Sequence, residues 1–210
     1  MKVVFLENVK HLKNHDDEKT FKRIQDELKD AGYYMKAEVL NSMTHGNVPQ
    51  TRERIYIVGF RSPRTLMKFH FPDKVPLTKT MASILEKGAE ENYYYSDRYP
   101  EIYPKLKAAV KHRDRFYQYR RIYVRENKNG VCPTLTASMG EGGHNVPIIR
   151  DSKGIRKLTP RECARLQGFP ESFLLPRTQA NAHLYKQIGS SVSVPVISRI
   201  AENIRIALES

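Results

Sequence analysis

Two short apolar runs, at residues 2–6 and 55–60, constrain the fold of this chain most strongly. Both are rich in β-branched residues and have the length of a strand that is buried on both faces. Between them, residues 14–32 have the periodicity of a helix, and residues 33–40 alternate well enough to form another strand. Strands and a helix in this order are typical of an α/β sheet with helices on its faces.

The helix expected at residues 14–32 has recognisable ends. Asp16 or Asp17 can cap its start, and Gly32 can end it. Its apolar residues share one face and are Phe21, Ile24 and Leu28.

After Arg61 the regular pattern stops. Prolines interrupt residues 61–79, and only a short helix is expected at residues 80–89. Residues 93–130 interleave tyrosines with lysines and arginines, and a glycine-rich loop follows at residues 132–145.

Two helices are expected in the last third of the chain. Thr159 forms a capping box with Glu162 at the start of the first helix, which also has a proline at its first position and is stopped by Gly168. The second helix, at residues 194–210, is amphipathic.

The charge of the chain is uneven. It has 36 Lys and Arg residues against 23 Asp and Glu residues, a net charge of +13. Residues 1–60 carry a net +1, residues 61–150 carry +8, and residues 151–210 carry +4. This distribution favours a polyanionic partner that binds mainly through the middle and the end of the chain. A solvated surface is the alternative.

Several classes of protein are disfavoured by composition. No apolar run approaches the roughly 20 residues that a membrane span needs, and the start has no signal-peptide pattern. Cys132 and Cys163 do not make a disulfide framework, and the seven histidines lack metal-ligand spacing. We therefore expect a cytoplasmic protein with no membrane partner and no metal.

Four stretches carry a resemblance to one family. They are "ENV" at residues 7–9, "QTRER" at 50–54, "RKLTPRECARLQGFP" at 156–170 and "GSSV" at 189–192. In this order they resemble the C-terminal portion of the DNA cytosine-5 methyltransferases. The third stretch is the most specific, and the resemblance covers nearly the whole chain apart from about residues 61–128.

The resemblance implies an α/β fold with a partial Rossmann-like methyltransferase sheet and a smaller, irregular, β-rich target-recognition domain. Residues 1–62 would form the C-terminal part of the catalytic α/β domain. Residues 63–155 would form the target-recognition domain, and residues 156–210 a helical return to the catalytic domain.

The resemblance also implies roles in catalysis. In this family a cysteine thiolate adds to carbon 6 of an extruded cytosine, and carbon 5 then accepts a methyl group from S-adenosyl-L-methionine. Glu7 would share a proton with the N3 and N4 edge of the cytosine, and Arg54 would stabilise charge at O2. Arg52 would brace the site or a phosphate. Support for the cytosine site would come from Asn8, Val9 and Gln50.

Taken alone, these segments have simpler explanations. Glu7 could be a surface carboxylate that pairs with Lys10 or Lys36, and residues 50–54 could be a charged turn before a strand.

Parts of the family pattern have no counterpart in these residues. There is no glycine-rich cofactor loop after a first strand, and no Pro-Cys pair occurs in the 210 residues. Cys132 and Cys163 are expected to be small buried hydrophobic residues, not nucleophiles.

Residues 132–145 resemble the region of the family that recognises DNA around an extruded base. We expect DNA contacts, through bases and phosphates, from Thr134, Thr136, Ser138, Gly142, Gly143, His144, Asn145, Arg120 and Arg121. A plain surface loop is the alternative, and the tyrosines of residues 105–125 can also pack a small core.

The turn at residues 189–192 departs from the Gly-Asn-Ser-Val of the family by a serine at position 190. The resemblance implies contact with S-adenosyl-L-methionine by Ser190, Ser191 and Val192. A contact through the family's asparagine side chain would not be made.

Two hypotheses remain open. The chain could be a subunit or C-terminal portion of a methyltransferase, docked along the strand at residues 2–6 to an N-terminal methyltransferase subunit that supplies the cysteine and most of the cofactor site. It could instead be a non-catalytic, sequence-specific DNA-binding remnant. Both involve double-stranded DNA in a bacterial cytoplasm, with a bacterial or phage gene as the source.

Overall fold

The computed structural model describes residues 2–141, 144–176 and 178–209. The chain divides into two compact units. The first unit comprises Met1–Gly46, Glu53–Pro76 and Pro195–Ser210, and the second comprises Asn47–Arg52 and Leu77–Val194.

A three-stranded sheet forms the centre of the first unit. Its order is β1 (Val3–Val9), β4 (Glu53–Phe60) and β2 (Tyr34–Asn41), and β4 runs antiparallel to both neighbours. The strands expected at residues 2–6, 33–40 and 55–60 are therefore present. Strand β1 is longer than expected, so that Glu7 lies within a paired strand and not at its end.

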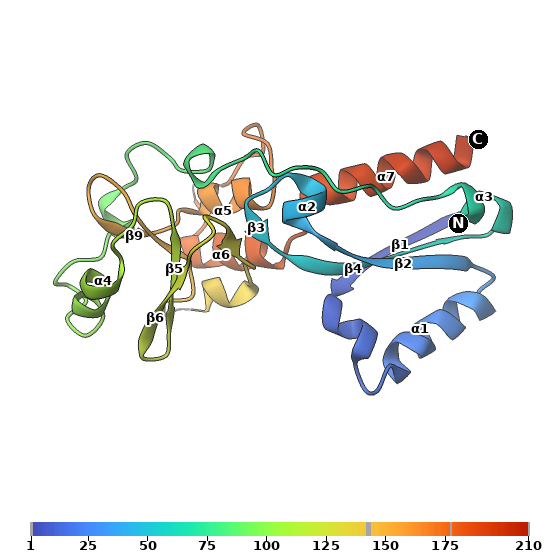
Figure 1. Ribbon diagram of the computed structural model, residues 1–210, viewed down its shortest axis with the longest axis horizontal. Coiled ribbons are helices and arrows are strands. Elements are labelled where there is room, and N and C mark those ends of the chain that lie inside the picture. Colours follow the sequence, from blue (N-terminus) through green and yellow to red (C-terminus); the bar gives the residue numbers. More distant parts are fainter. Residues whose placement is uncertain (1, 142–143, 177, 210) are drawn as a thin grey trace. The chain divides into compact units, whose positions relative to one another are not determined.

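Helices lie on opposite sides of this sheet (Figure 1). The side chains of Tyr56, Val58 and Phe60 alternate along β4 to one face, where they pack against α7 (Val194–Glu209). The amphipathic helix expected at the end of the chain is thus confirmed, because its residues Val196 and Ile200 are fully buried against the sheet.

Helix α1 (Lys19–Asp30) begins later than the sequence indicates. The prediction that Asp16 or Asp17 caps it is wrong, because both residues and Glu18 have positive φ angles and form a left-handed turn before the helix. Its end is as expected. Gly32 has φ +79°, and the Tyr33 amide donates to the carbonyl of Leu28, the pattern of a Schellman motif.

The first unit also contains short helical segments, which are the 3₁₀ turn η1 (Lys10–Asn14), α2 (Ser42–Gly46) and α3 (Pro63–Lys68). Helix α3 was not predicted, although Ser62 accepts a hydrogen bond from the Thr65 amide and a proline occupies the first position.

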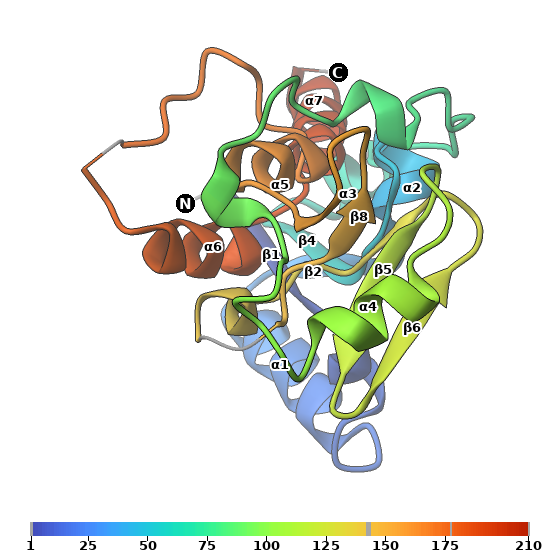
Figure 2. The same cartoon turned by 90° about the vertical axis from the view of Figure 1, so that its left-hand side faces the viewer.

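The second unit contains a four-stranded antiparallel sheet of order β6-β5-β8-β9. The strands are β5 (Phe116–Arg120), β6 (Tyr123–Asn127), β8 (Ile148–Arg150) and β9 (Ile155–Lys157). Strands β5 and β6 form a hairpin beside α4 (Tyr103–Ala109) (Figure 2). A separate parallel pair joins β3 (Gln50–Thr51) to β7 (Cys132–Pro133).

The remaining elements of the second unit are helical. They are the 3₁₀ turns η2 (Met81–Ser83), η3 (Glu91–Tyr93) and η4 (Ala137–Gly140), and the helices α5 (Pro160–Leu166) and α6 (Asn181–Ser190). The short helix expected at residues 80–89 is reduced to η2, and α6 was not predicted. Residues 189–192 therefore form the end of α6 and the start of its connection to α7.

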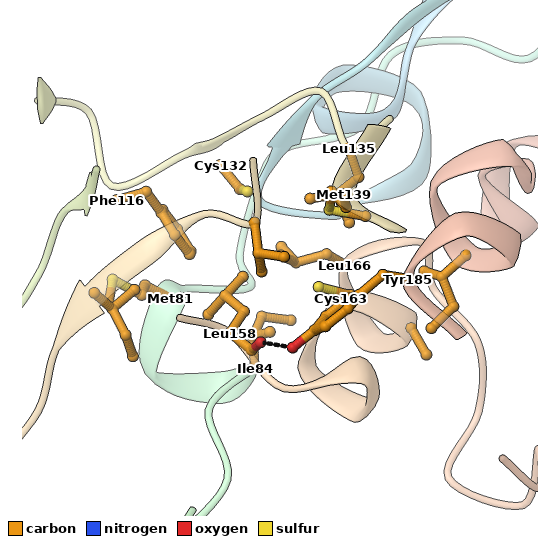
Figure 3. Packing of buried hydrophobic residues seen from close by; sticks show 14 of the residues in the cluster. Met81, Ile84, Phe116, Cys132, Leu135, Met139, Leu158, Cys163, Leu166 and Tyr185 are labelled. Carbon is orange, nitrogen blue, oxygen red and sulfur yellow. Dashed lines mark hydrogen bonds between the residues drawn. The ribbon is translucent and has the colours of Figure 1, made fainter. Parts of the chain in front are cut away.

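The core of the second unit brings α5, α6 and the segment of Leu135 and Met139 together (Figure 3). The hydroxyl of Tyr185 on α6 donates to the carbonyl of Leu158 at 2.5 Å. Residues 156–194 therefore pack with residues 77–155, whereas the sequence groups them with the catalytic part. The functional division into catalytic and recognition domains stays a prediction.

The most specific stretch, at residues 156–170, has a structural role in this unit. Thr159 and Glu162 form the predicted capping box at the start of α5. Both carboxylate oxygens of Glu162 also accept hydrogen bonds from the guanidinium of Arg156, at 2.7 and 2.8 Å. Since both side chains are almost fully buried, loss of Arg156 would leave the charge of Glu162 buried without its ion-pair partner.

Candidate functional site

Glu7 and Arg54 form an ion pair in the first unit. Their Oε1 and Nε atoms lie 3.2 Å apart, and the side chains are 22% and 14% exposed. In the register of β1 and β4, Glu7 is opposite Tyr56, so Arg54 is its diagonal neighbour on the same face of the sheet. A carboxylate and a guanidinium are thereby held together on rigid strands.

The simpler explanation for Glu7 is not what the structure has. Lys10 pairs with Glu53 at 2.5 Å, and the ammonium of Lys36 donates to the carbonyl of Phe69 at 2.6 Å. Both lysines therefore have other partners.

Asn8 and Val9, expected to support the cytosine site, are exposed at the end of β1. The side-chain oxygen of Asn8 accepts a hydrogen bond from the Val9 amide at 2.8 Å. This bond lies within the last two residues of β1, and among the described residues no hydrogen bond or ion pair joins the side chain of Asn8 to Glu7.

Gln50, in the second unit, is fully buried and joins segments that are far apart in the sequence. Its Nε2 donates to the carbonyl of Leu166 at 2.7 Å and to Oε1 of Gln167 at 3.2 Å. Its Oε1 accepts from the Leu135 amide at 3.0 Å, and Gln167 in turn donates to the carbonyl of Ile188. Gln50 thus fixes the loop of residues 132–141, and its support of the cytosine site stays a prediction.

Arg52, also in the second unit, is 3% exposed. Its Nη1 donates to the carbonyl of Leu135 at 2.8 Å, and its Nη2 donates to the carbonyl of Ser191 at 2.5 Å. These contacts fix the main chain at Leu135 and Ser191, and a role of Arg52 at the cytosine site stays a prediction. They do not support contact with a phosphate, because the guanidinium is buried against main-chain carbonyls.

Close packing against the main chain of Thr136 explains why position 189 is a glycine. A Cβ atom placed there would lie 2.1 Å from the carbonyl oxygen of Thr136, closer than any real contact. Gly140 packs in the same way, because its Cβ would lie 2.2 Å from the carbonyl oxygen of Ala182. Helix α6 and the 132–141 loop are therefore in main-chain contact.

Most of the residues expected to bind DNA gather around one pocket of about 400 Å³ in the second unit. Those that line it are Thr134, Thr136, Ser138, His144, Asn145 and Arg120. Gly142 and Gly143 lie outside the described residues.

Hydrogen bonds inside the pocket wall hold these side chains. Thr134 donates to the carbonyl of Thr51 at 2.6 Å, and the hydroxyls of Thr136 and Ser138 are 2.8 Å apart. Asn145 donates to the carbonyl of Ser138 at 3.1 Å. Four of the side chains that line the pocket are therefore hydrogen-bonded within its wall.

His144 is held by tyrosines. Its Nδ1 lies 2.9 Å from the hydroxyl of Tyr95, and its ring contacts those of Tyr95, Tyr99 and Tyr119. Burial, and then the charge of Lys157, lower the pKa of His144. From residues 105–125, Tyr117 and Tyr119 pack with Tyr95 in a small core, which was one of the two roles expected for the tyrosines there.

The β5–β6 turn carries the two arginines expected to bind phosphate. Arg120 and Arg121 are exposed, and Arg121 has φ +54° at the turn. Arg115, by contrast, is ion-paired with Glu126. The turn therefore presents two cations to solvent.

Comparison with known proteins decides which family has this arrangement. Residues 2–205 match the family model of the C-5 cytosine-specific DNA methylases. The chain belongs to this family. Type II methyltransferase M.Bsp6I of Bacillus sp. (strain RFL6) is 53% identical over 204 residues, which are 96% of this chain and 64% of that protein. Type II methyltransferase M.NlaX of Neisseria lactamica is 38% identical over 98% of this chain and 63% of that protein.

Solved structures have the same fold. The Entamoeba histolytica methyltransferase EhMeth superposes with a TM-score of 0.74 at 19% identity, covering 100% of this chain and 64% of its own. The S. pombe Dnmt2 methyltransferase gives a TM-score of 0.72 at 18% identity, covering 100% and 68%. This methylase chain therefore spans just under two thirds of the length of the curated relatives above.

The three residues expected to contact the cofactor differ in their exposure and in their hydrogen bonds within the chain. Ser191 uses its hydroxyl to donate to the carbonyl of Ile188 and its own carbonyl to accept from Arg52. Ser190 is exposed and Val192 is partly buried. Ser191 also lines an apolar pocket of about 410 Å³ with Phe169 and other residues. These groups fit an apolar part of a ligand better than a charged one.

Neither cysteine of the methylase chain has the environment of a nucleophile. Cys132 and Cys163 are fully buried in the core of the second unit, and burial raises the pKa of each thiol. Among the described residues, no group of three or more His, Cys, Asp and Glu could hold a metal ion. In the same part of the chain, no helix has both the length and the apolar character to cross a membrane.

Two buried amides of the chain were not predicted from the sequence. Gln167 accepts a hydrogen bond from Gln50. Gln118 on β5 lines the pocket of about 400 Å³ beside the loop of residues 132–141. Gln118 follows the apolar Phe116 by two residues in a strand-like run, and this spacing could have placed both side chains on one inward face.

Proposed function

We propose that this chain provides the target-recognition part and a share of the catalytic site of a DNA (cytosine-5) methyltransferase. The observation that carries the proposal is the Glu7–Arg54 pair on adjacent strands. The family implies that these two groups bind an extruded cytosine. Before the cytosine binds, the attraction between the opposite charges of Glu7 and Arg54 offsets the desolvation cost of burying each side chain in part.

In this proposal the two side chains divide the cytosine between them. The Glu7 carboxyl would share a proton at N3 and N4 while charge develops on the ring, and the Arg54 guanidinium would stabilise charge at O2. Because Glu7 and Arg54 are in contact, the cytosine would bind along their outer atoms or part them. Both come from strands, which suits the precise positioning that such groups need.

Arg52 and Gln50 would act as positioning residues. Both side chains would fix the main chain at Leu135. They would thus hold the loop of residues 132–141, here called the recognition loop, in one place. The cysteine nucleophile would come from the part of the methyltransferase that the relatives have and these residues do not cover. S-adenosyl-L-methionine would supply the methyl group when bound, and this chain would contribute Ser190, Ser191 and Val192 to one side of it.

The proposed substrate is double-stranded DNA in a bacterial cytoplasm. Support comes from the net charge of +13 and from the exposed Arg120 and Arg121. Arg120 lines the pocket of about 400 Å³ described above, here called the recognition pocket. The curated relatives above are named type II methyltransferases, so a restriction-modification system is the proposed setting.

Reconstitution tests the proposal. The purified chain is mixed with the N-terminal portion of the 53% identical relative, and transfer of labelled methyl groups to duplex DNA is measured. Methyl transfer is expected only from the mixture. Glu7→Gln and Arg54→Ala should each lower the rate at least about 100-fold, whereas Glu53→Gln and Arg64→Ala should not.

A second candidate is a DNA-binding protein without catalysis, because the recognition pocket is built entirely within the second unit. The same experiment separates the two. Sequence-selective DNA binding with no methyl transfer from any mixture would favour the second candidate.

A further inference from the structure

Gln118 is a buried amide whose oxygen has no hydrogen-bond partner among the described residues. The residue is 9% exposed, and its Oε1 atom is buried. A buried carbonyl oxygen that lacks a donor carries the full penalty of leaving water. Such a group is expected where a ligand supplies the missing donor.

The strand directs this amide into the recognition pocket. Side chains alternate along β5, so Gln118 lies on the same face as Phe116, whereas Tyr117 packs in the other cluster. Phe116 points into the core that contains Leu135 and Met139 (Figure 3). Gln118, Leu135 and Met139 all line the pocket of about 400 Å³.

The neighbouring polar groups do not satisfy Gln118, because they bond elsewhere. Thr134 donates to the carbonyl of Thr51, and Thr136 and Ser138 bond to each other. His144 bonds to Tyr95. The volume of the pocket is within the range of about 300–1,000 Å³ that is typical of small-ligand pockets.

We infer that the pocket receives an adenine of the DNA target and that Gln118 is the residue that reads it. An amide offers one acceptor and one donor side by side, and in DNA recognition this pair matches N6 and N7 of adenine. Oε1 accepts from the N6 amino group, and the amide nitrogen donates to N7. Arg120, two residues along the same face of β5, is exposed and lines the same pocket, where it binds the adjoining phosphate.

This inference rests on the proposed function, since it requires that the chain binds DNA. It goes further by naming a specificity-determining residue, the base that it reads and the two atoms of that base that are contacted.

The test is a selection of preferred sites from a random duplex pool by the full chain, followed by binding measurements on the selected duplex. Wild type should require adenine at one position. Gln118→Leu should reduce that preference by roughly 10-fold to 100-fold, with other positions unchanged. Gln118→Glu, which keeps the shape but has only acceptors, should prefer cytosine at that position. Gln187→Leu, on an exposed part of α6, is the control.

Base analogues separate direct contact from packing. Replacing the adenine by 7-deazaadenine, or by a purine without the amino group, should weaken binding of wild type but not of Gln118→Leu. Equal losses for both proteins would overturn the inference and leave the proposed function intact. If wild type binds DNA with no sequence preference, or does not bind it, the proposed function fails and this inference fails with it.

Discussion

The guanidinium of Arg52 donates to the carbonyl of Leu135 at 2.8 Å, across 83 residues of sequence. The same side chain donates to the carbonyl of Ser191. One buried cation therefore holds the recognition loop and the turn between α6 and α7 by their main chains, which makes the recognition loop a fixed part of the second unit.

Replacement of Arg52 by methionine should destabilise the protein by about 2–3 kcal/mol, because two buried carbonyls lose a charged donor. Urea unfolding followed by circular dichroism measures the change. Arg113→Met, at an exposed position of the same unit, should change the free energy of unfolding by less than about 0.5 kcal/mol. Equal effects of the two substitutions would contradict the bracing role.

Gly189→Ala should destabilise the second unit by about 1–3 kcal/mol, since the new methyl group would overlap the carbonyl of Thr136. Gly154→Ala is the matched control, because its methyl group would meet only an ordinary contact with Tyr94 at 3.6 Å. Thermal unfolding midpoints of both variants test this. A Gly189→Ala protein as stable as wild type would mean that α6 and the loop are not in firm contact.

Acid should remove the stabilising contribution of Asp151. Burial by itself raises the pKa of this carboxyl, but hydrogen bonds from Arg156 and from two backbone amides outweigh that effect and hold the pKa below its usual value. A lowered pKa in the folded protein stabilises it above the unfolded value of about 3.9 and ceases to do so as the pH falls through the folded value.

Asp151→Asn should therefore cost about 2 kcal/mol near pH 7 and much less near pH 2. Urea midpoints of wild type and variant across this range measure the difference. Asp97→Asn, at an exposed position, should give a small difference at every pH. A constant difference for Asp151→Asn would refute the assigned ionic role.

Binding to DNA should depend on salt through Arg120 and Arg121. Replacing both by alanine should make the plot of log affinity against log salt shallower by about 2, because each phosphate that is no longer neutralised lowers the slope by about 0.9. Arg115→Ala should leave the slope unchanged because Arg115 pairs with Glu126. Exposed Arg23 and Arg64 of the first unit, replaced together, provide the control.

The sequence predicted the regular parts of the fold well for physical reasons. The runs that became β1 and β4, the capping box at Thr159 and the amphipathic end of the chain are local signals. The left-handed turn at Asp16 was missed because acidic residues before a helix usually cap it. Helix α6 was missed because its buried residues, such as Tyr185, depend on contacts with distant segments.

Some residues of the candidate site could likewise be predicted from the sequence, and others could not. The family resemblance placed Glu7 and Arg54 at one site, and the register of β1 and β4 brings the two side chains together. The burial of Arg52 was not foreseeable, since nothing in "QTRER" distinguishes an arginine that meets main-chain carbonyls from one that meets phosphate. Gln118 was overlooked because its significance lies in a missing partner, which only a three-dimensional structure reveals.

The contacts that hold the recognition loop engage its backbone, from the amide and carbonyl of Leu135 to the carbonyl of Thr136. Backbone groups are identical whatever side chain they carry. Substitutions at Thr136 or Ser138 would therefore leave the main chain of the loop anchored while they change the polar groups that line the pocket. Under the proposed function, one main-chain framework could carry side chains that suit different DNA targets.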